Sequence, residues 1–343
     1  MTYVPLHVHS EYSLLDGLSQ THQISKRISD IETNVCALTD HGSVSGAVDF
    51  SRTLSNASQK PILGCEFYIC FNSAQEKTQE NRNLVHQVIL AKNLQGWKDI
   101  LGLVSQSNHP DQFYYKPRID FDQLKQVAHK GNLISFSGHL GSYLGKLAAE
   151  NESDDLICTA ALRMQEIFGK DNFFIEIQLI DSDNNETSRV TAEKLRQISI
   201  KTGIPCVATP DAHYPTREAA EDQQVLLCTS LKKTVGQVQR ELKKGKSRSL
   251  ECFFSSNNFH IPSYEEMKQY HNDEELANTV LIADMCEPYN ILGPPNPPEF
   301  NCPSGYSPKE YLRYICKMGW AQKMQHVNKE NPKFPQYGER VNK

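Results

Sequence analysis

Two histidines separated by one residue are the first candidates for chemistry in this sequence. His7 and His9 lie within a stretch of alternating apolar residues that predicts a β-strand over residues 4–8. Side chains two residues apart in a strand point to the same face. Because a neutral imidazole nitrogen is the commonest protein ligand for metal ions, the two rings could bind one ion or two neighbouring ions.

Further apolar runs predict six more strands, each followed by a mostly helical crossover. These strands are Val35–Leu38, Ile62–Tyr68, Val85–Ala91, Leu133–Phe136, Phe173–Ile177 and Cys206–Ala208. Strands that alternate with helical crossovers pair in parallel, which predicts an α/β fold with either a barrel or a doubly wound sheet.

Polar residues of metal-binding type fall in these strands, at their ends or in the loop after the first. They are His7, His9, Asp16, His41, Glu66, His86, His139, Asp211 and His213. A parallel barrel gathers the carboxyl ends of its strands at one face, whereas an open sheet spreads them along a line. The pattern therefore favours a closed or nearly closed barrel with one polar site.

Nine nitrogen and oxygen ligands are too many for one tetrahedral zinc ion. They suit two or three ions with a bridging carboxylate, and such clusters bind phosphate esters and activate water. Any one of these residues alone could instead be an ordinary core or surface residue. Asp40 could orient His41 or cap a strand end, and for Glu176 a solvated strand position is favoured over a role in orienting a ligand.

The composition is that of a soluble globular protein, with 343 residues, 38% hydrophobic residues and a net charge of -5. The ten cysteines are scattered, which predicts reduced, mostly buried thiols in a cytoplasmic protein. No apolar run reaches the length of a membrane-spanning helix. The net charge argues against a surface that coats nucleic acid, but it does not exclude a nuclease whose bound cations offset its carboxylates.

Beyond Tyr214 the pattern becomes mostly helical. We expect a barrel over residues 1–250 and a helical extension over 251–343 that is the beginning of a larger structure. The predicted helices are Arg217–Cys228, Glu265–Tyr270, Glu274–Met285 and, after a proline-rich connector at 293–298, Pro308–Met324.

A basic stretch over 232–248 could contact DNA phosphates, although a solvated helix face is favoured. Aromatic and basic residues at 114–118 could stack a terminal base or simply pack within a loop.

Six motifs in order resemble the PHP (polymerase and histidinol phosphatase) family, and more narrowly the PHP domain that opens bacterial-type DNA polymerase III alpha subunits. The motifs are LHVHSEYSLLDG, TDHG, GCEFY, HQVILA, SGHLGS and TPDAHY. Later segments, including EELANTVLIADMCE and EYLRYICKMGW, resemble the entry to the palm of that polymerase. The resemblance implies a distorted (β/α)7 TIM-like barrel followed by a mostly helical C-terminal extension.

The resemblance also implies a trinuclear site that binds zinc or manganese, with magnesium as an alternative. His7, His9, Glu66 and Asp211 would hold the first ion and form the catalytic centre. Glu66 would bridge to a second ion held by His86 and His139. Asp16, His41 and His213 would hold the third. The polymerase group often has cysteine where this chain has His139, so the ligand set here looks complete.

The implied activity is 3′→5′ exonucleolytic hydrolysis of DNA. The expected partners are the primer 3′ end, the remaining polymerase domains and a separate proofreading subunit, with no membrane. The D-x-D motif Asp181-Ser182-Asp183 is in the wrong context for a polymerase palm, so the chain should not extend primers alone. The alternatives are a stand-alone phosphomonoesterase, as in histidine biosynthesis, and a non-enzymatic, metal-stabilised scaffold. A metal-dependent amidohydrolase would usually have a bridging lysine where this chain has His86.

Overall fold

The computed structural model describes residues 3–138, 140–178, 186–245, 251–295 and 297–341. The chain divides into two compact units, Met1–Leu292 and Gly293–Lys343. Each unit is described by itself.

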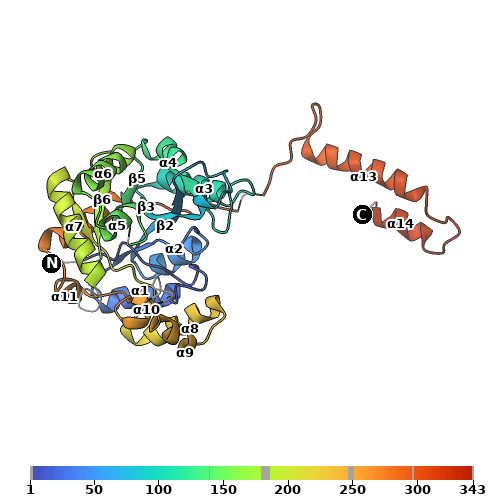
Figure 1. The fold of residues 1–343 in the computed structure, drawn as a ribbon. Coiled ribbons are helices and arrows are strands. Elements are labelled where there is room, and N and C mark those ends of the chain that lie inside the picture. Colours follow the sequence, from blue (N-terminus) through green and yellow to red (C-terminus); the bar gives the residue numbers. More distant parts are fainter. Residues whose placement is uncertain (1–2, 139, 179–185, 246–250, 296, 342–343) are drawn as a thin grey trace. The chain divides into compact units, whose positions relative to one another are not determined.

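A curled mixed sheet forms the centre of the first unit (Figure 1). Its strands are β1 (Val35–Leu38), β2 (Lys60–Cys70), β3 (Val85–Ala91), β4 (Ile119–Asp120), β5 (Leu133–Phe136), β6 (Phe173–Ile177) and β7 (Cys206–Ala208). They are ordered β1-β2-β3-β5-β6-β7, with β4 paired to β2. This arrangement confirms the predicted distorted TIM-like α/β class. Parallel pairing throughout is wrong, however, because β3 runs antiparallel to both β2 and β5.

The predicted first strand is present as an extended segment that joins the two ends of this strand order. On one side, Ala37 donates a backbone hydrogen bond to Pro5 O (2.9 Å), and Thr39 N donates to Val8 O (2.9 Å). On the other side, His9 N donates to Ala212 O (2.8 Å), just after β7. Val8 and Ala212 form a single parallel bridge. The segment thus links β1 to the residues after β7 and brings the sheet close to a closed barrel.

Helices surround this sheet (Figure 1). The helices of the first unit are α1 (Thr21–Asp30), α2 (Ala47–Asn56), α3 (Leu94–Ser107), α4 (Phe121–Ala128), α5 (Tyr143–Ala149), α6 (Asp154–Phe168), α7 (Glu186–Thr202), α8 (Ala220–Leu231), α9 (Val235–Leu242), α10 (Glu251–Ser255), α11 (Tyr264–Met267) and α12 (Asp273–Met285), with 3-10 turns at Glu80–Arg82 and Arg217–Ala219. Side-chain caps begin several of them; Asn93, for example, accepts from Gly96 N at 3.0 Å.

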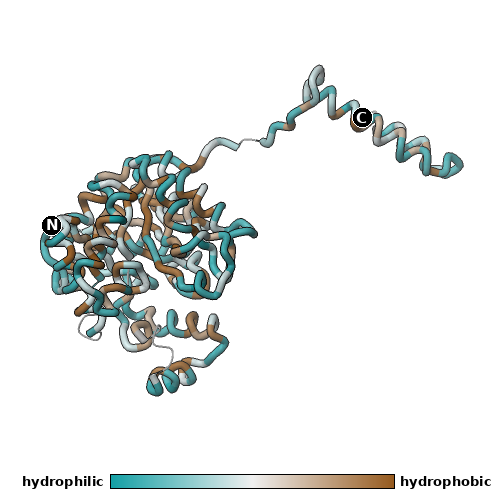
Figure 2. The backbone as a smooth tube through the Cα atoms, turned by 45° about the horizontal axis from the view of Figure 1, so that its top comes forward, coloured by the Kyte–Doolittle hydropathy of each residue, from teal (hydrophilic) through white to brown (hydrophobic). Residues whose placement is uncertain are grey.

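One layer of the apolar core lies inside the curled sheet, and α12 packs against this layer. Apolar side chains of the strands pack there against Ile282 and Ala283 of α12 and against Cys286, which directly follows it. Figure 2 shows brown, apolar stretches running through the interior of this unit. Thr279 Oγ1 accepts from Val4 N at 3.1 Å, and Asn278 donates to Cys206 O at 2.8 Å. Because α12 is part of the core, the first compact unit extends to Leu292. The domain boundary expected near residue 250 stays a prediction.

The second unit contains α13 (Pro308–Met324) and α14 (Phe334–Val341). The bounds of α13 are those predicted, and a capping box begins it, with Ser307 Oγ accepting from Glu310 N at 3.4 Å. None of the residues of α13 is buried. Its resemblance to the entry of a polymerase palm stays a prediction.

The contact between α7 and α12 predicts a pH-dependent contribution to stability. Arg196 donates to both carboxylate oxygens of Glu275, at 2.6 and 2.8 Å, and His271 Nδ1 lies 2.9 Å from the same group. Burial would raise the pKa of Glu275, but the hydrogen bonds from Arg196 and His271 outweigh it and lower the pKa to about 2. The stabilisation is therefore complete above the ordinary pKa of 4.5 and is lost as pH falls toward 2.

We expect Glu275→Gln to lower the free energy of unfolding at pH 7 by about 2 kcal/mol, since it breaks a buried pair. The difference from wild type should shrink between pH 4.5 and pH 2 in urea unfolding curves. Glu274→Gln, at the exposed neighbouring position on α12, is the matched control. A pH-independent difference would contradict this assignment.

Candidate metal centre

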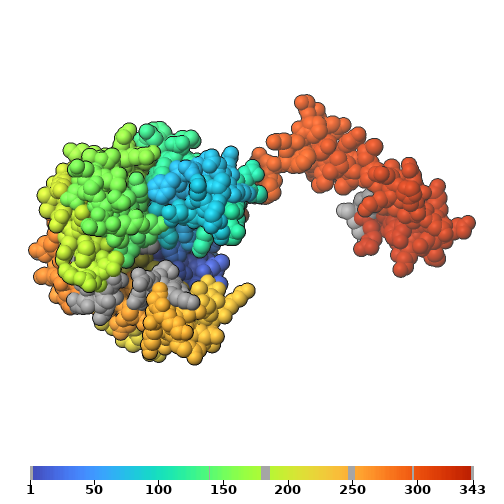
Figure 3. Space-filling view, viewed as in Figure 1, coloured from blue at the N-terminus to red at the C-terminus, as the bar shows by residue number. Residues whose placement is uncertain are grey.

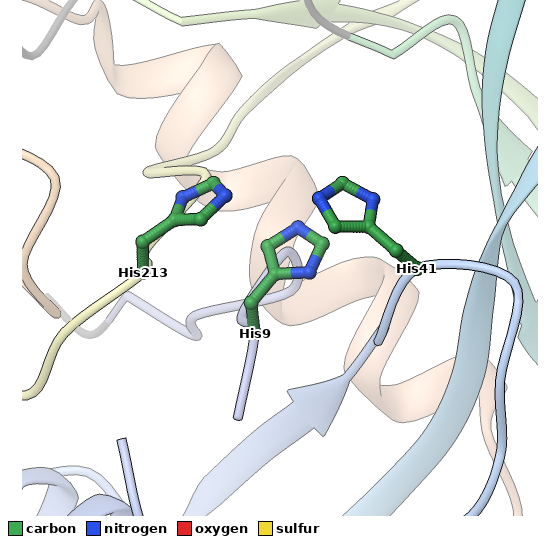
Figure 4. Close-up of side chains that lie close together, drawn as sticks. All are labelled: His9, His41 and His213. Carbon is green, nitrogen blue, oxygen red and sulfur yellow. The ribbon is translucent and has the colours of Figure 1, made fainter. Parts of the chain in front are cut away.

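Ligand-type side chains from distant parts of the chain converge at one face of the barrel. Figure 4 shows the rings of His9, His41 and His213 turned toward one another, from the N-terminal segment, the loop after β1 and the residues after β7. The ring centroids of His9 and His41 are 4.2 Å apart, and those of His9 and His213 are 4.5 Å apart. The close approach of three imidazoles is typical of a metal site rather than of apolar packing.

The first group consists of His7, His9 and Asp211, all of them buried. The Nε2 atoms of His7 and His9 lie 3.3 and 3.2 Å from Asp211 Oδ1. Glu66 Oε2 lies 3.7 Å from His7 Nε2 and 3.4 Å from His9 Nε2. The structure therefore brings together the four residues that were expected to hold the first ion.

Glu66 also belongs to the second group, with His41 and His86. Its Oε2 lies 2.6 Å from His41 Nδ1, and its Oε1 lies 2.9 Å from His86 Nδ1. Because both oxygens face imidazole nitrogens, Glu66 has the placement of a bridging carboxylate. His86 is near the start of β3, yet it reaches the site because β3 runs antiparallel to β2, where it pairs with Tyr68.

The third group is His9, His41 and His213. Asp16 Oδ2 lies 3.0 Å from His41 Nε2 and 3.8 Å from His213 Nε2. The three groups share residues. The geometry therefore does not divide the ligands among three separate ions as clearly as the prediction did. His139 lies outside the described residues.

Hydrogen bonds at Nδ1 fix the orientation of three of the rings. His7 Nδ1 lies 2.7 Å from Glu176 Oε1, His9 Nδ1 lies 3.0 Å from Ser13 Oγ, and His213 Nδ1 lies 2.8 Å from Asp211 O. Acceptors at these positions favour a proton on Nδ1 and leave the Nε2 lone pair free to bind an ion.

The environment keeps the central histidine neutral and the nearest loop carboxylate ionised. Burial and the neighbouring rings of His41 and His213 lower the pKa of His9 to about 3. Burial alone would raise the pKa of Asp16, but His213 and His41 lower it below its ordinary value. A neutral imidazole and an ionised carboxylate are the forms that bind metal ions.

Glu176, for which the sequence favoured a solvated strand position, lies in a different environment. It is 1% exposed rather than solvated, and besides His7 it accepts hydrogen bonds from Thr209 Oγ1 and from Gln178 Nε2. Every residue of β6 is buried, so the alternation that distinguishes a solvated face is absent from this strand. Glu176 is far from His7 in the sequence, so no local pattern indicated that the two side chains would be in contact.

Asp40 caps the loop after the first segment and does not orient the His41 ring. It accepts from Ser10 N (2.7 Å), Ser10 Oγ (2.8 Å) and Ser13 Oγ (2.8 Å). Since Ser13 Oγ also contacts His9 Nδ1, Asp40 acts on a ligand through one hydroxyl. The prediction that Asp40 is a cap is therefore the correct alternative.

Tight backbone packing holds the ligand-bearing loops. Asp211 has a φ of 46°, in the left-handed region that costs a non-glycine residue about 1 to 3 kcal/mol and that persists only where the surroundings fix it. A Cβ on Gly17 would lie 2.2 Å from Ser10 O, so the loop that carries Asp16 can close only with glycine at this position.

The donor set fits divalent cations. It consists, within the described residues, of five imidazoles and three carboxylates: His7, His9, His41, His86, His213, Asp16, Glu66 and Asp211. The buried Oδ1 of Asp16 has no hydrogen-bond partner among the residues that the structure describes. Several imidazoles favour zinc or manganese over magnesium, whose preferred ligands are oxygen atoms. Five of these residues, Asp16, His41, His86, Asp211 and His213, line an open cleft of about 1950 Å³.

The PHP domain profile matches residues 5–179. The chain belongs to the PHP domain family. It is 34% identical to the DNA polymerase III subunit alpha of Treponema pallidum over 96% of this chain and 27% of that protein. It is 33% identical to the same subunit of Borreliella burgdorferi over 92% of this chain and 26% of that protein. The chain thus spans about a quarter of the length of these curated relatives.

Two solved structures are also similar to this PHP domain. An amidohydrolase from Chromobacterium violaceum is 15% identical, with a TM-score of 0.41 over 62% of this chain and 88% of that one. A putative metal-dependent phosphoesterase from Bifidobacterium adolescentis is 13% identical, with a TM-score of 0.37 over 61% and 87%. Within the described residues, no helix is both long and apolar enough to cross a membrane.

We expect Glu176→Gln to weaken metal binding about tenfold, because replacing the carboxylate that holds a ligand histidine typically costs 10- to 100-fold in affinity. Competition with a chromophoric chelator, in separate zinc and manganese titrations, measures this change. Glu193→Gln, at an exposed position on α7, is the control and should bind as wild type does. Equal affinities for all three proteins would show that Glu176 does not support the ligand.

Proposed function

We propose that this PHP domain is a metal-dependent phosphoesterase that removes nucleotides from the 3′ end of DNA, as the amino-terminal part of a DNA polymerase III alpha subunit. The observation that supports it most is the placement of Glu66 between imidazoles of two ligand groups, beside an open cleft that His41 and His86 line. Clusters of this type suit a phosphate ester, whose oxygens can contact more than one cation.

His7, His9, Glu66 and Asp211 are the proposed catalytic centre, with three divalent ions, zinc or manganese and alternatively magnesium, as cofactors. Bound cations would polarise the phosphoryl group and would lower the pKa of a bound water molecule toward neutral pH. The chain contributes the rest. Nδ1 contacts present the Nε2 atoms of His7 and His9, and the buried carboxylate of Glu66 balances the positive charge.

The proposed partners follow from the relatives rather than from the site. They are the primer 3′ end, the polymerase domains that would follow this chain and a separate proofreading subunit. The D-x-D motif at residues 181–183 lies outside the described residues, and the inability of this chain to extend primers stays a prediction. DNA synthesis belongs, in this proposal, to the longer protein.

Digestion of a 3′-mismatched primer–template tests the proposal. With manganese or zinc, wild type should release single nucleotides, and Asp211→Asn should be at least about 100-fold slower because it removes a charged ligand from the first group. Asp222→Asn, at an exposed position on α8, should retain wild-type activity. Equal release by wild type and Asp211→Asn would point to a contaminating nuclease.

Failure to release nucleotides with any metal would overturn the proposal, and two further measurements separate the alternatives. Turnover of a phosphate monoester would support a stand-alone phosphomonoesterase. A lower melting temperature after chelation, without hydrolysis of either substrate, would support a metal-stabilised scaffold.

A further inference from the structure

The loop at 114–118 is built around a buried arginine. Arg118 is 0% exposed, and its guanidinium donates to the backbone carbonyls of Ala74, Glu76, Asn81 and Gln112. Burying a charged side chain with this many directed hydrogen bonds fixes the loop in one conformation.

The aromatic residues of this loop are used in its own packing. The guanidinium of Arg118 lies 5.0 Å from the ring of Tyr114, and that of Arg82 lies 4.0 Å from the ring of Tyr115. These contacts support loop packing over the alternative that the two rings stack a terminal base. Lys116, between them and Pro117, is the exposed cation that the loop presents.

Lys116 is held at the edge of the metal centre. Its Nζ donates to the Tyr68 hydroxyl at 3.3 Å and lies 5.0 Å from the centre of the Tyr68 ring. The same ring packs edge-on against His86, with centroids 4.9 Å apart, and stacks on His41 at 6.0 Å. One tyrosine therefore connects the ammonium group to two candidate metal ligands.

The loop also packs directly beside the His41 backbone. Gly42 has a φ of 57°, and a Cβ there would lie 2.7 Å from Pro117 Cγ and 3.3 Å from Tyr68 Cε2. Because Gly42 has no side chain, the loop can pack directly against the backbone beside His41.

Lys116 is one of few cationic side chains in the cleft. Among the described residues that line the cleft, Lys116 and Lys243 are the only lysines or arginines. No carboxylate among the described residues forms an ion pair with Lys116. An ammonium group that lies beside a metal centre, and has no anionic partner of its own, is suited to bind an anion that enters the cleft.

Figure 3 shows the yellow and orange residues of α8 and α9 below the barrel. Lys243 directly follows α9 in the sequence. This region and the loop at 114–118 contribute to the lining of the same cleft. Each of the two regions therefore contributes one cation to the lining of the cleft.

We propose that Lys116 binds a non-bridging phosphate oxygen of the substrate, and that Tyr68 positions it. The inference rests on the proposed phosphoesterase function and adds a specific substrate contact to it. Lys116 contributes to binding the phosphate group and not to holding the metal ions.

Calorimetric titration of the metal-loaded chain with inorganic phosphate tests the contact without requiring hydrolysis. Lys116→Met should weaken phosphate binding about tenfold, Lys116→Arg should recover most of it because the charge is kept, and Tyr68→Phe should weaken it about threefold. Metal content should be that of wild type in all three variants. Lys98→Met, at an exposed position on α3 outside the cleft, should bind phosphate as wild type does.

Unchanged phosphate affinity in Lys116→Met, with full metal content, would overturn the inference. Loss of metal from Lys116→Met would overturn it as well, since Lys116 would then support the centre itself. If wild type hydrolyses DNA, Lys116→Met should raise KM more than it lowers kcat. If wild type binds phosphate through Lys116 but hydrolyses neither ester, the proposed function fails and the anion site stands.

Discussion

The buried carboxylate of Glu66 is the constraint on which the rest of the first unit depends. It is 1% exposed, and its two oxygens face imidazole nitrogens from the N-terminal segment, from the loop after β1 and from β3. An ionised group in such a place requires directed partners, because burying an unpaired charge is far more costly than any single apolar contact returns. The barrel supplies these partners by bringing strand ends to one point, and the same partners suit divalent cations.

Much of this arrangement follows from local sequence signals. The bounds of β1, β3, β5, β6 and β7 are those predicted, because each is a short apolar run between polar segments. The ligand set was recognisable because histidines and carboxylates occur near strand ends, where side chains converge. Their convergence is confirmed for the described residues, while their role as metal ligands stays a prediction.

Other features depend on contacts that no local pattern encodes. The direction of β3 is set by its pairing with β2 and β5, and a run such as Val85–Ala91 reads the same in either direction. The burial of Glu176 requires the partner His7, far away in sequence. The packing of α12 against the barrel has the same cause, since its sequence is that of an ordinary helix until its contacts with Val4 and β7 are known.

The extended segment at residues 5–9 has a consequence for the order of assembly. It forms hydrogen bonds with Thr39 and also with Ala212, so its second set of partners leaves the ribosome long after the first. Contacts that close such long loops form late in folding, because their entropic cost must be met first. Asp211 and His213 are synthesised at the same late stage as Ala212. A nascent chain therefore lacks the complete set of candidate ligands until the barrel can close.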